Sequence, residues 1–433
     1  LRPAAAGTAR MLTDAPAPPP LPDLAPDQVA AWQAVAARLA AHGVDVAAGT
    51  TGAREAPDEA EVMAITGRAG SGKTVLLAGL AASLKAAGLG AVTPDWEPRK
   101  GSDRRSFAVL APTNKAASVL RAKGVPATTI HRIVYKPVYD PEFEKVADWL
   151  EDPAKPRPGT EALDAVALER ARASYTEHGS VPGALAAAGL RGADFITGWT
   201  RRDDPLDIAL VDEASMIEGR QLEDLTRIFG LVVLFGDPAQ LAPVKAGGRM
   251  VFDDLPEARR HALARVHRQE AGSPILDLAH ALADPDLGFE GFEALVRETA
   301  RRDERVTVTG RVDAGLMQAS PVLVWRNRTR VRLIRAFREA HGCPGEALLP
   351  GEPLVCDGLE LPLKRRKERM DLEARGLVKG AQAVYLGPGR RPGFAKVRIL
   401  GSEEPGMSVA AIIQIESPDA DEPRLLSAAR MGA

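Results

Sequence analysis

The stretch EVMAITGRAGSGKT, residues 61–74, decides the fold. Residues 61–66 are a short apolar run typical of a buried strand, and residues 74–88 have the composition of a helix that ends at a glycine. Between the two, residues 67–74 match the pattern G-x-x-x-x-G-K-[ST]. A glycine-rich turn at this place lets backbone N–H groups curl around a phosphate at the N-terminus of a helix. The stretch therefore predicts a phosphate-binding loop on an α/β sheet.

Every residue of this loop is a candidate for nucleotide binding. The set is Gly67, Arg68, Ala69, Gly70, Ser71, Gly72, Lys73 and Thr74. Lys73 supplies a positive charge to the β- and γ-phosphates, and the hydroxyl of Thr74 is a ligand for Mg²⁺. The alternative is a glycine-rich turn that fits by accident, which the strand before it and the helix after it disfavour. We expect ATP and Mg²⁺ as cofactors.

Three further apolar runs are typical of buried strands. They are SFAVLAPT (106–113), DIALVDEA (207–214) and LVVLFGDP (231–238). A helix is predicted at about 23–42, where apolar residues recur at three- and four-residue spacing, and others between the strands. Strands that alternate with helices predict a mostly parallel, doubly wound sheet.

Acidic and amide side chains follow two of these runs. Asp212 is placed to hold Mg²⁺ through water, and Glu213 to accept a proton from the attacking water. An apolar strand that ends in two acids is common, but behind a phosphate-binding loop the pair suits metal-assisted hydrolysis of a phosphoanhydride. Gln240 follows the turn signature GDP (236–238) and is placed to sense the γ-phosphate or position water.

Seven segments stand in the order and spacing of superfamily 1 helicase motifs. They are GRAGSGKT (67–74), APTNKAA (111–117), TIHR (129–132), VDEASM (211–216), GDPAQLAPV (236–244), VHRQ (266–269) and VWRNRTR (324–330). Over about residues 24–400 the chain most resembles the RecD-like branch, including its phage-type members. The resemblance implies an ATP-dependent DNA helicase that moves 5′→3′ along single-stranded DNA and unwinds tailed duplex DNA. It also implies an α/β fold of tandem RecA-like P-loop NTPase domains with an inserted subdomain and a small β-rich module.

The resemblance assigns further roles. Gln28 resembles the glutamine that reads adenine, with a solvated helix glutamine as the alternative. Arg268 resembles the arginine that reaches the γ-phosphate from the second domain, and it joins Lys73, Asp212, Glu213 and Gln240 as catalytic. The implied DNA-contacting residues are Thr113, Asn114, Lys115, Thr129, His131, Arg132, Asn327, Thr329 and Arg330, the last three in a loop of the second domain. The alternatives are a plain helix N-cap for Thr113 and a structural histidine for His131.

Two motifs of that family are absent from the sequence. They are motif V (T-x-H-K-[AS]-Q-G) and motif VI, a helix with a second arginine finger. We therefore expect a truncated motor that binds Mg·ATP, hydrolyses it poorly and unwinds little. The absence favours a non-translocating ATP-binding scaffold, or degenerate helicase, as the alternative, whereas the intact catalytic residues speak against it. A third interpretation is an RNA helicase of the same superfamily, and the pathway (repair, recombination or phage replication) stays open.

The expected organisation has five parts. They are a disordered, proline-rich lead (1–22), RecA-like domain 1A (23–135 and 205–260), an insertion (136–204) where the 5′→3′ branch places its strand-splitting pin, the start of domain 2A (261–347) with a strand PVLVW (321–325), and a β-rich 2B-like module (348–433). The length of the chain suits two or three domains.

Composition sets outer limits on these interpretations. Lys and Arg number 56 against 58 Asp and Glu, a net charge of −2, which counts against non-specific coating of nucleic acid. No run of about 18 apolar residues or signal-peptide pattern is present, so we expect no membrane partner. Cys343 and Cys356 have no partners at metal-ligand spacing, which predicts two reduced thiols in a cytoplasmic protein.

Overall fold

The computed structural model describes most of the chain between residues 24 and 412. The described ranges are 24–53, 59–93, 105–139, 141–152, 154–159, 164–178, 181, 184, 196–243, 248–264, 273–282, 284, 286–311, 313–319, 322–324, 326–342, 348–355, 382–389, 394–399 and 408–412. They fall into unit 1 (within 1–134 and 201–292) and unit 2 (within 135–200 and 293–433). The lead at 1–22, Arg268, Trp325 and both cysteines lie outside the described residues.

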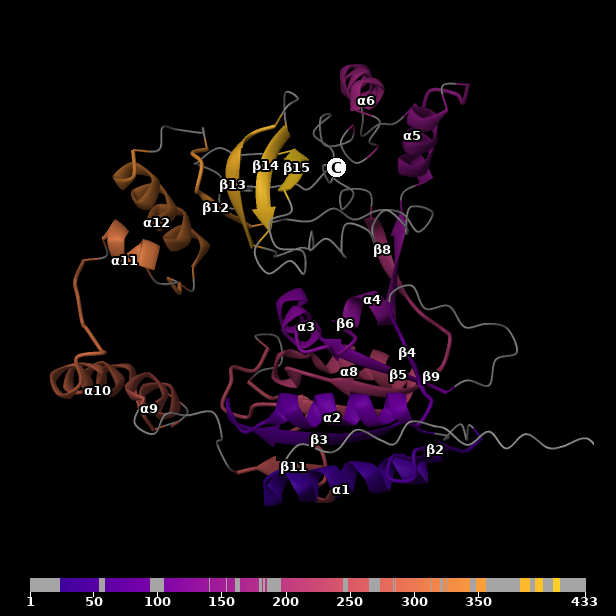
Figure 1. Cartoon of the computed structure of the whole chain (residues 1–433), viewed down its shortest axis with the longest axis vertical. Helices are drawn as coiled ribbons and strands as arrows, with labels where there is room; N and C mark the ends of the chain where they lie inside the picture. Colours follow the sequence, from indigo (N-terminus) through magenta and orange to yellow (C-terminus); the bar gives the residue numbers. More distant parts are fainter. Residues whose placement is uncertain are drawn as a thin grey trace, which may run out of the picture. The chain divides into compact units, whose positions relative to one another are not determined.

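Unit 1 is built on a seven-stranded sheet in which every pairing is parallel (Figure 1). The strands are β3 (Glu61–Gly67), β4 (Gly90–Ala91), β5 (Ser106–Ala111), β6 (Ala127–Thr129), β9 (Leu206–Val211), β10 (Phe229–Gly236) and β11 (Arg260–Leu263). Their order is β11-β3-β10-β9-β5, with β4 and β6 both paired to β5. β5 and β9 are buried at every position, as expected for parallel strands covered on both faces.

Unit 1 also contains helices and short elements. They are α1 (Pro26–Ala41), α2 (Lys73–Ala86), α3 (Asn114–Arg121), α4 (Ile130–Val134), η2 (Ala214–Met216), α8 (Gly219–Thr226), η4 (Glu257–Arg259), α9 (Pro274–Ala281) and the small ladder of β1 (Val44–Asp45) and β2 (Thr50–Thr51). The main core joins the buried side chains of α1, α2 and α3 to alternate residues of the strands, such as Phe107 and Val109. This period of two follows from the pleat of a strand.

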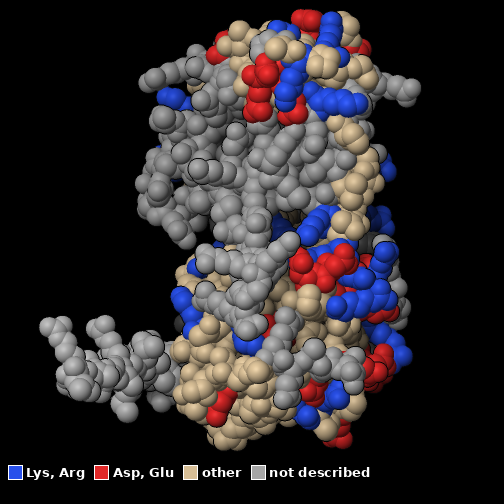
Figure 2. All heavy atoms as spheres, turned by 90° about the vertical axis from the view of Figure 1, so that its right-hand side faces the viewer, with Lys and Arg blue, Asp and Glu red and all other residues tan. Residues whose placement is uncertain are grey.

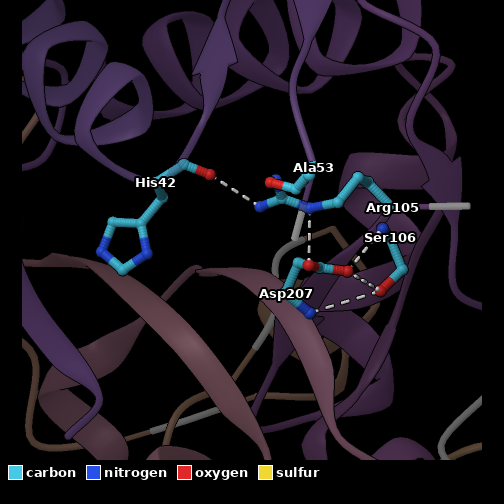
Figure 3. A network of polar contacts seen from close by, with 5 residues as sticks. All are labelled: His42, Ala53, Arg105, Ser106 and Asp207. Atoms are coloured by element: carbon cyan, nitrogen blue, oxygen red, sulfur yellow. Dashed lines mark hydrogen bonds and ion pairs between the residues drawn. The ribbon is translucent and has the colours of Figure 1, made fainter. Parts of the chain in front are cut away.

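A buried polar network ties the amino ends of β5 and β9 together (Figure 3). Asp207 accepts a hydrogen bond from Arg105 Nε at 2.7 Å, and from the backbone N–H and hydroxyl of Ser106 at 2.8 and 2.9 Å. The guanidinium also donates to the carbonyl of His42, just after α1, at 2.8 Å. Arg105 and Asp207 are only 6% and 7% exposed, so both charges depend on these contacts.

Residues 136–200 of the insertion expected at 136–204 lie in unit 2. It contains β7 (Tyr135–Tyr139) paired with β8 (Ile196–Arg201), and between them α5 (Pro141–Glu151) and α6 (Ala165–His178). The two helices have a hydrophobic core of their own, in which the Arg172 guanidinium lies 4.9 Å from the centre of the Trp149 ring. At its base, Arg202 donates from its backbone to the carbonyl of Val134 at 2.8 Å. The insertion therefore leaves and rejoins the chain at neighbouring points.

The rest of unit 2 has helices followed by an antiparallel sheet. The elements are α10 (Phe289–Arg302), α11 (Ala314–Ala319), α12 (Asn327–Ala340), β12 (Pro353–Val355), β13 (Gln382–Pro388), β14 (Phe394–Ile399) and β15 (Ser408–Ile412). The sheet order is β12-β13-β14-β15, and every pairing is antiparallel. Among the described residues, no helix is long and apolar enough to cross a membrane.

Residues 261–347 differ from expectation in two ways. β11 pairs with β3, so the first sheet continues into the segment expected to open a second domain. The strand predicted at 321–325 is wrong for the three residues described, because 322–324 form no strand and Leu323 is 93% exposed. An apolar run becomes a strand only when another strand pairs with it, and a second parallel sheet is not found in the described part of the chain.

Candidate nucleotide-binding site

The site lies where three adjacent strands end. β10 pairs with β3 on one side and β9 on the other, with Gly236 opposite Thr66 and Leu234 opposite Val211. Because the strands are parallel, their carboxyl ends share one edge of the sheet. The loop after β3, Asp237 after β10 and Asp212 after β9 therefore meet at this edge.

The loop between β3 and α2 depends on left-handed backbone. Gly70 and Gly72 have φ angles of 86° and 83°, which side chains of L-residues rarely allow. Gly72 caps α2, so Lys73 is the first residue of the helix. The predicted glycine-rich turn and helix start are confirmed, and the N–H groups of the first helical turn are available for an anion.

Lys73 folds back over the loop. Its Nζ donates to the carbonyl of Gly67 and, at 3.1 Å, to that of Arg68. Burial lowers the pKa of Lys73, while the charges of Asp237, Glu213 and Asp212, in decreasing order, act to raise it. The ammonium is therefore partly withdrawn from water and lies in the field of three carboxylates from two neighbouring strand ends.

Asp212 is the more buried of the two acids that follow β9, Asp212 and Glu213, with only 8% of its surface exposed. Burial raises the pKa of Asp212, the charge of Glu213 adds to that, and the backbone N–H of Glu213, which donates to Oδ1 at 3.0 Å, acts to lower it. A buried carboxylate with raised pKa is stabilised in its ionised form by a nearby cation. A cation bound beside Asp212 would counter this shift and keep the carboxylate ionised.

Glu213 has a strained backbone and a defined side-chain partner. Its φ of 51° is the one positive value outside glycine among the described residues, a conformation that costs about 1–2 kcal/mol. Gln240 Nε2 donates to Glu213 Oε2 at 3.2 Å, and the buried Ser215 donates from its hydroxyl to Gln240 Oε1 at 2.9 Å. Since a carboxylate only accepts, the amide nitrogen of Gln240 must face Glu213. The structure thus brings Gln240 and Glu213 together.

Asp237 is a site residue that sequence reasoning missed. It is 4% exposed, and it exerts the strongest carboxylate effect on Lys73. Its Oδ1 accepts from the backbone N–H of Ala239 at 2.9 Å, as in the turn that the GDP pattern predicts. The sequence does show an acid at the end of an apolar strand. Such an acid belongs to the site only if β10 lies directly beside β3, and the sequence alone does not reveal that pairing.

Gln28 connects α1 to the loop. It is 5% exposed, its Nε2 donates to the carbonyl of Ser71 at 3.1 Å, and its Oε1 accepts from the backbone of Ala25 at 2.9 Å. The alternative of a solvated helix glutamine is therefore wrong. Recognition of adenine by Gln28 stays a prediction, supported by its contact with the loop.

The expected DNA-contacting residues of unit 1 follow β5 and β6. Thr113 caps α3, and its hydroxyl accepts from the backbone N–H of Ala116 at 3.2 Å. The structure therefore shows the plain helix N-cap that was the alternative to DNA contact. Asn114 and Lys115 form the first turn of α3. Thr129 is buried at the end of β6, whereas His131, on α4, is exposed and Arg132 half-buried. These strand ends lie on the same edge of the sheet as the nucleotide site.

The residues expected in a loop of the second domain are helical. Asn327, Thr329 and Arg330 form the first turn of α12, so the loop prediction is wrong for them. Arginine and asparagine have adequate helix propensity, and the helical pattern continues through residue 340. α12 belongs to unit 2 and is described on its own.

We expect substitutions of Thr113 to separate its two roles. Alanine removes the cap and should lower the free energy of unfolding by about 1 kcal/mol, whereas aspartate caps as well as threonine does. If Thr113 also faces a DNA phosphate, T113D lowers oligonucleotide affinity by repulsion with little change in stability. Urea unfolding and fluorescence anisotropy measure the two effects, and T113S should preserve both. If T113D binds the oligonucleotide with unchanged affinity, Thr113 acts only as the N-cap of α3 and does not face a DNA phosphate.

The donor set fits Mg²⁺ bound together with a nucleotide. Among the described residues, no cluster of three or more His, Cys, Asp or Glu side chains could hold a metal. Mg²⁺ in phosphate sites takes one or two protein oxygens and completes its shell with phosphate oxygens and water. The Thr74 hydroxyl and the Asp212 carboxylate are oxygen donors of this kind.

A glycine-rich loop between β3 and α2, facing acidic ends of neighbouring parallel strands, defines a RecA-like P-loop domain. The family model described as "AAA domain" matches residues 50–307, more than half of the chain, and the chain belongs to this family. The expected fold of this part is thus confirmed.

Solved structures similar to this chain include three of Pif1 helicases. The enzyme from Candida albicans has 16% identity over 93% of this chain and 82% of its own, with a TM-score of 0.41. A structure of two coordinating Pif1 helicases at forked double-stranded DNA has 13% identity, coverage of 91% and 77%, and a TM-score of 0.44. Bacteroides Pif1 bound to single-stranded DNA has 12% identity, coverage of 85% and 75%, and a TM-score of 0.40. A search of curated proteins gives no match.

Proposed function

We propose that this chain is the motor part of an ATP-dependent DNA helicase that moves 5′→3′ along single-stranded DNA. The observation that carries the proposal is the position of the Lys73 ammonium in the field of Asp212, Glu213 and Asp237 at adjacent strand ends. Membership of the AAA domain family supports the use of ATP. The order and spacing of the helicase-like motifs support DNA as the polymer along which the motor moves.

In this proposal each side chain of the site has one task. The loop N–H groups and Lys73 bind the phosphates, and Glu213 accepts a proton from the attacking water. Gln240, held in orientation by Ser215, positions the Glu213 carboxylate and senses the γ-phosphate. Thr74 and Asp212 would hold Mg²⁺, which when bound would supply positive charge to the phosphates. Arg268, which lies outside the described residues, is proposed as the arginine that reaches the γ-phosphate.

The sheet suggests how ATP and DNA are coupled. The nucleotide residues follow β3, β10 and β9, and the expected DNA residues follow β5 and β6, the next strands in the same sheet. A change at Asp212 is therefore one strand away from Thr113, since β9 and β5 pair directly. A motor needs ATP to favour one conformation over another, and short rigid connections of this kind can transmit that preference.

ATPase and unwinding assays on this chain test the proposal. We expect single-stranded DNA, more than RNA, to stimulate slow ATP hydrolysis, and any unwinding to occur on 5′-tailed and not 3′-tailed duplexes. Glu213→Gln should abolish hydrolysis while ATP still binds, because it removes only the proton acceptor. Glu223→Gln, at an exposed position of α8, is the matched control. Tight ATP binding without stimulation by DNA would favour the scaffold, and stimulation by RNA the RNA helicase.

A further inference from the structure

Helix α1 carries a polar side chain on its buried face. The buried residues of this helix are Gln28, Ala31, Val35 and Leu39, and the three apolar ones belong to the main core of unit 1. A buried amide needs hydrogen-bond partners, and those of Gln28 are backbone groups. Its Nε2 donates to the carbonyl of Ser71 at 3.1 Å, and its Oε1 accepts from the N–H of Ala25 at 2.9 Å. Gln28 thus connects the first turn of α1 to the middle of the phosphate-binding loop.

The polarity of these two partners fixes the orientation of the Gln28 amide. A backbone N–H only donates and a carbonyl only accepts, so a turned amide would face both partners with the wrong group. The other end of α1 is held as well, because Arg38 forms an ion pair with Glu61 at the start of β3, at 3.2 Å. The side chain of Gln28 is therefore a fixed support for the loop.

Gln28 contacts the loop where its backbone has most freedom. Ser71 lies between Gly70 and Gly72, and glycine backbone rotates with little steric hindrance. Among the described residues, no other side chain from outside the loop forms a hydrogen bond with residues 67–74, and the buried hydroxyl of Ser71 has no partner. The peptide bond between Ser71 and Gly72 is trans, so its N–H points opposite to its carbonyl. Because Gln28 holds the carbonyl, the N–H of Gly72 points away from α1.

The charge of the chain does little to attract an anion to this loop. The net charge is −2, and on the face of the molecule in Figure 2 the described Lys and Arg residues are interspersed with Asp and Glu. Mixed charges of this kind leave little long-range field. At the loop, the ammonium of Lys73 lies in the field of Asp212, Glu213 and Asp237. Binding of a triphosphate therefore depends strongly on how well the N–H groups of the loop are placed.

We propose that Gln28 is a positioning residue of the loop: by holding the Ser71 carbonyl, it keeps the Gly72 N–H turned toward the bound phosphate, whatever base the nucleotide carries. Successive backbone N–H groups bind an anion well when they already converge on it, because no ordering has to accompany binding. This role differs from the reading of adenine, for which the amide must contact the base. It rests on the proposed function only in taking the loop as the triphosphate site.

Affinities of the full chain for Mg·ATP, Mg·GTP and Mg·tripolyphosphate, measured by isothermal titration calorimetry, test this role. Gln28→Met keeps the length of the side chain but removes the donor, so all three affinities should fall by a similar factor of about five to ten, as for the loss of one hydrogen bond. In the ligand-free protein, amide hydrogen exchange within residues 67–74 should become faster. The matched control is Gln33→Met, the same change at an exposed position of α1, which should alter neither.

A loss confined to ATP would overturn the proposal, because Gln28 would then read the base, and so would unchanged affinity for all three ligands. Val35→Ala weakens the packing of α1 without touching Gln28; it should lower the free energy of urea unfolding and leave the three affinities unchanged. If it weakened binding as much as Gln28→Met does, the effect would belong to the stability of α1 and not to the loop contact. Lys73→Ala tests the triphosphate site itself. Weak binding by Lys73→Ala together with normal binding by Gln28→Met would overturn only the role of Gln28 and leave the proposed function standing.

Discussion

Replacing Lys73 by alanine should weaken ATP binding at least about 100-fold, equivalent to about 2.7 kcal/mol. The substitution removes the ammonium that lies against the carbonyls of Gly67 and Arg68, and with it the positive charge on which Asp212, Glu213 and Asp237 all act. A triphosphate would then enter a site of uncompensated negative charge, and repulsion at a partly buried site is strong. Isothermal titration calorimetry with Mg·ATP measures the loss directly.

The control for this experiment is on the same helix. Lys85 lies in the last turn of α2 and is exposed, so Lys85→Ala removes an equal charge without touching the loop. Lys73→Arg keeps the charge but has a planar guanidinium, which fits the loop carbonyls poorly and should restore binding only in part. An ATP affinity of Lys73→Ala within threefold of the parent would contradict the assignment of the loop, and the proposed function with it.

The strands and the loop were predictable because their signals are local. The four apolar runs became β3, β5, β9 and β10 within a few residues of the predicted ends, and the glycine pattern marked the start of α2. Buried parallel strands are apolar throughout, so composition alone identifies them. The acidic ends of β9 and β10 were visible too, but which strand lies beside which is not a local property.

Sheet order explains what the sequence could not give. Asp237 belongs to the site because β10 lies between β3 and β9. Of the three carboxylates, it is the one that raises the pKa of Lys73 most. The helical start of α12 at Asn327 was hidden because the preceding apolar run suggested a strand and then a loop. The Arg105–Asp207 contact joins residues 102 positions apart, and neither residue has a local pattern that distinguishes it from a surface charge.

That contact should be the largest single polar contribution to the stability of unit 1. Asp207→Ala leaves the Arg105 guanidinium buried, with the His42 carbonyl and a weaker contact to Ala53 as its described partners. Breaking a buried ion pair from one side typically costs about 3–5 kcal/mol, because the remaining charge loses its compensation. The hydroxyl and backbone N–H of Ser106 lose their acceptor as well. We therefore expect the midpoint of urea unfolding to fall sharply in this variant.

Two comparisons separate the buried pair from charge loss in general. Asp254→Ala breaks the exposed pair with Arg249 and should cost less than about 1 kcal/mol, as surface pairs do. Arg105→Met/Asp207→Leu replaces both charges by apolar groups and should recover most of the stability lost in Asp207→Ala, because neither partner is left alone. ATP affinity should stay normal in every variant that folds, since the network lies at the amino ends of β5 and β9 and the nucleotide site at the carboxyl ends. A cost for Asp207→Ala no greater than that for Asp254→Ala would mean that water, and not Asp207, solvates Arg105.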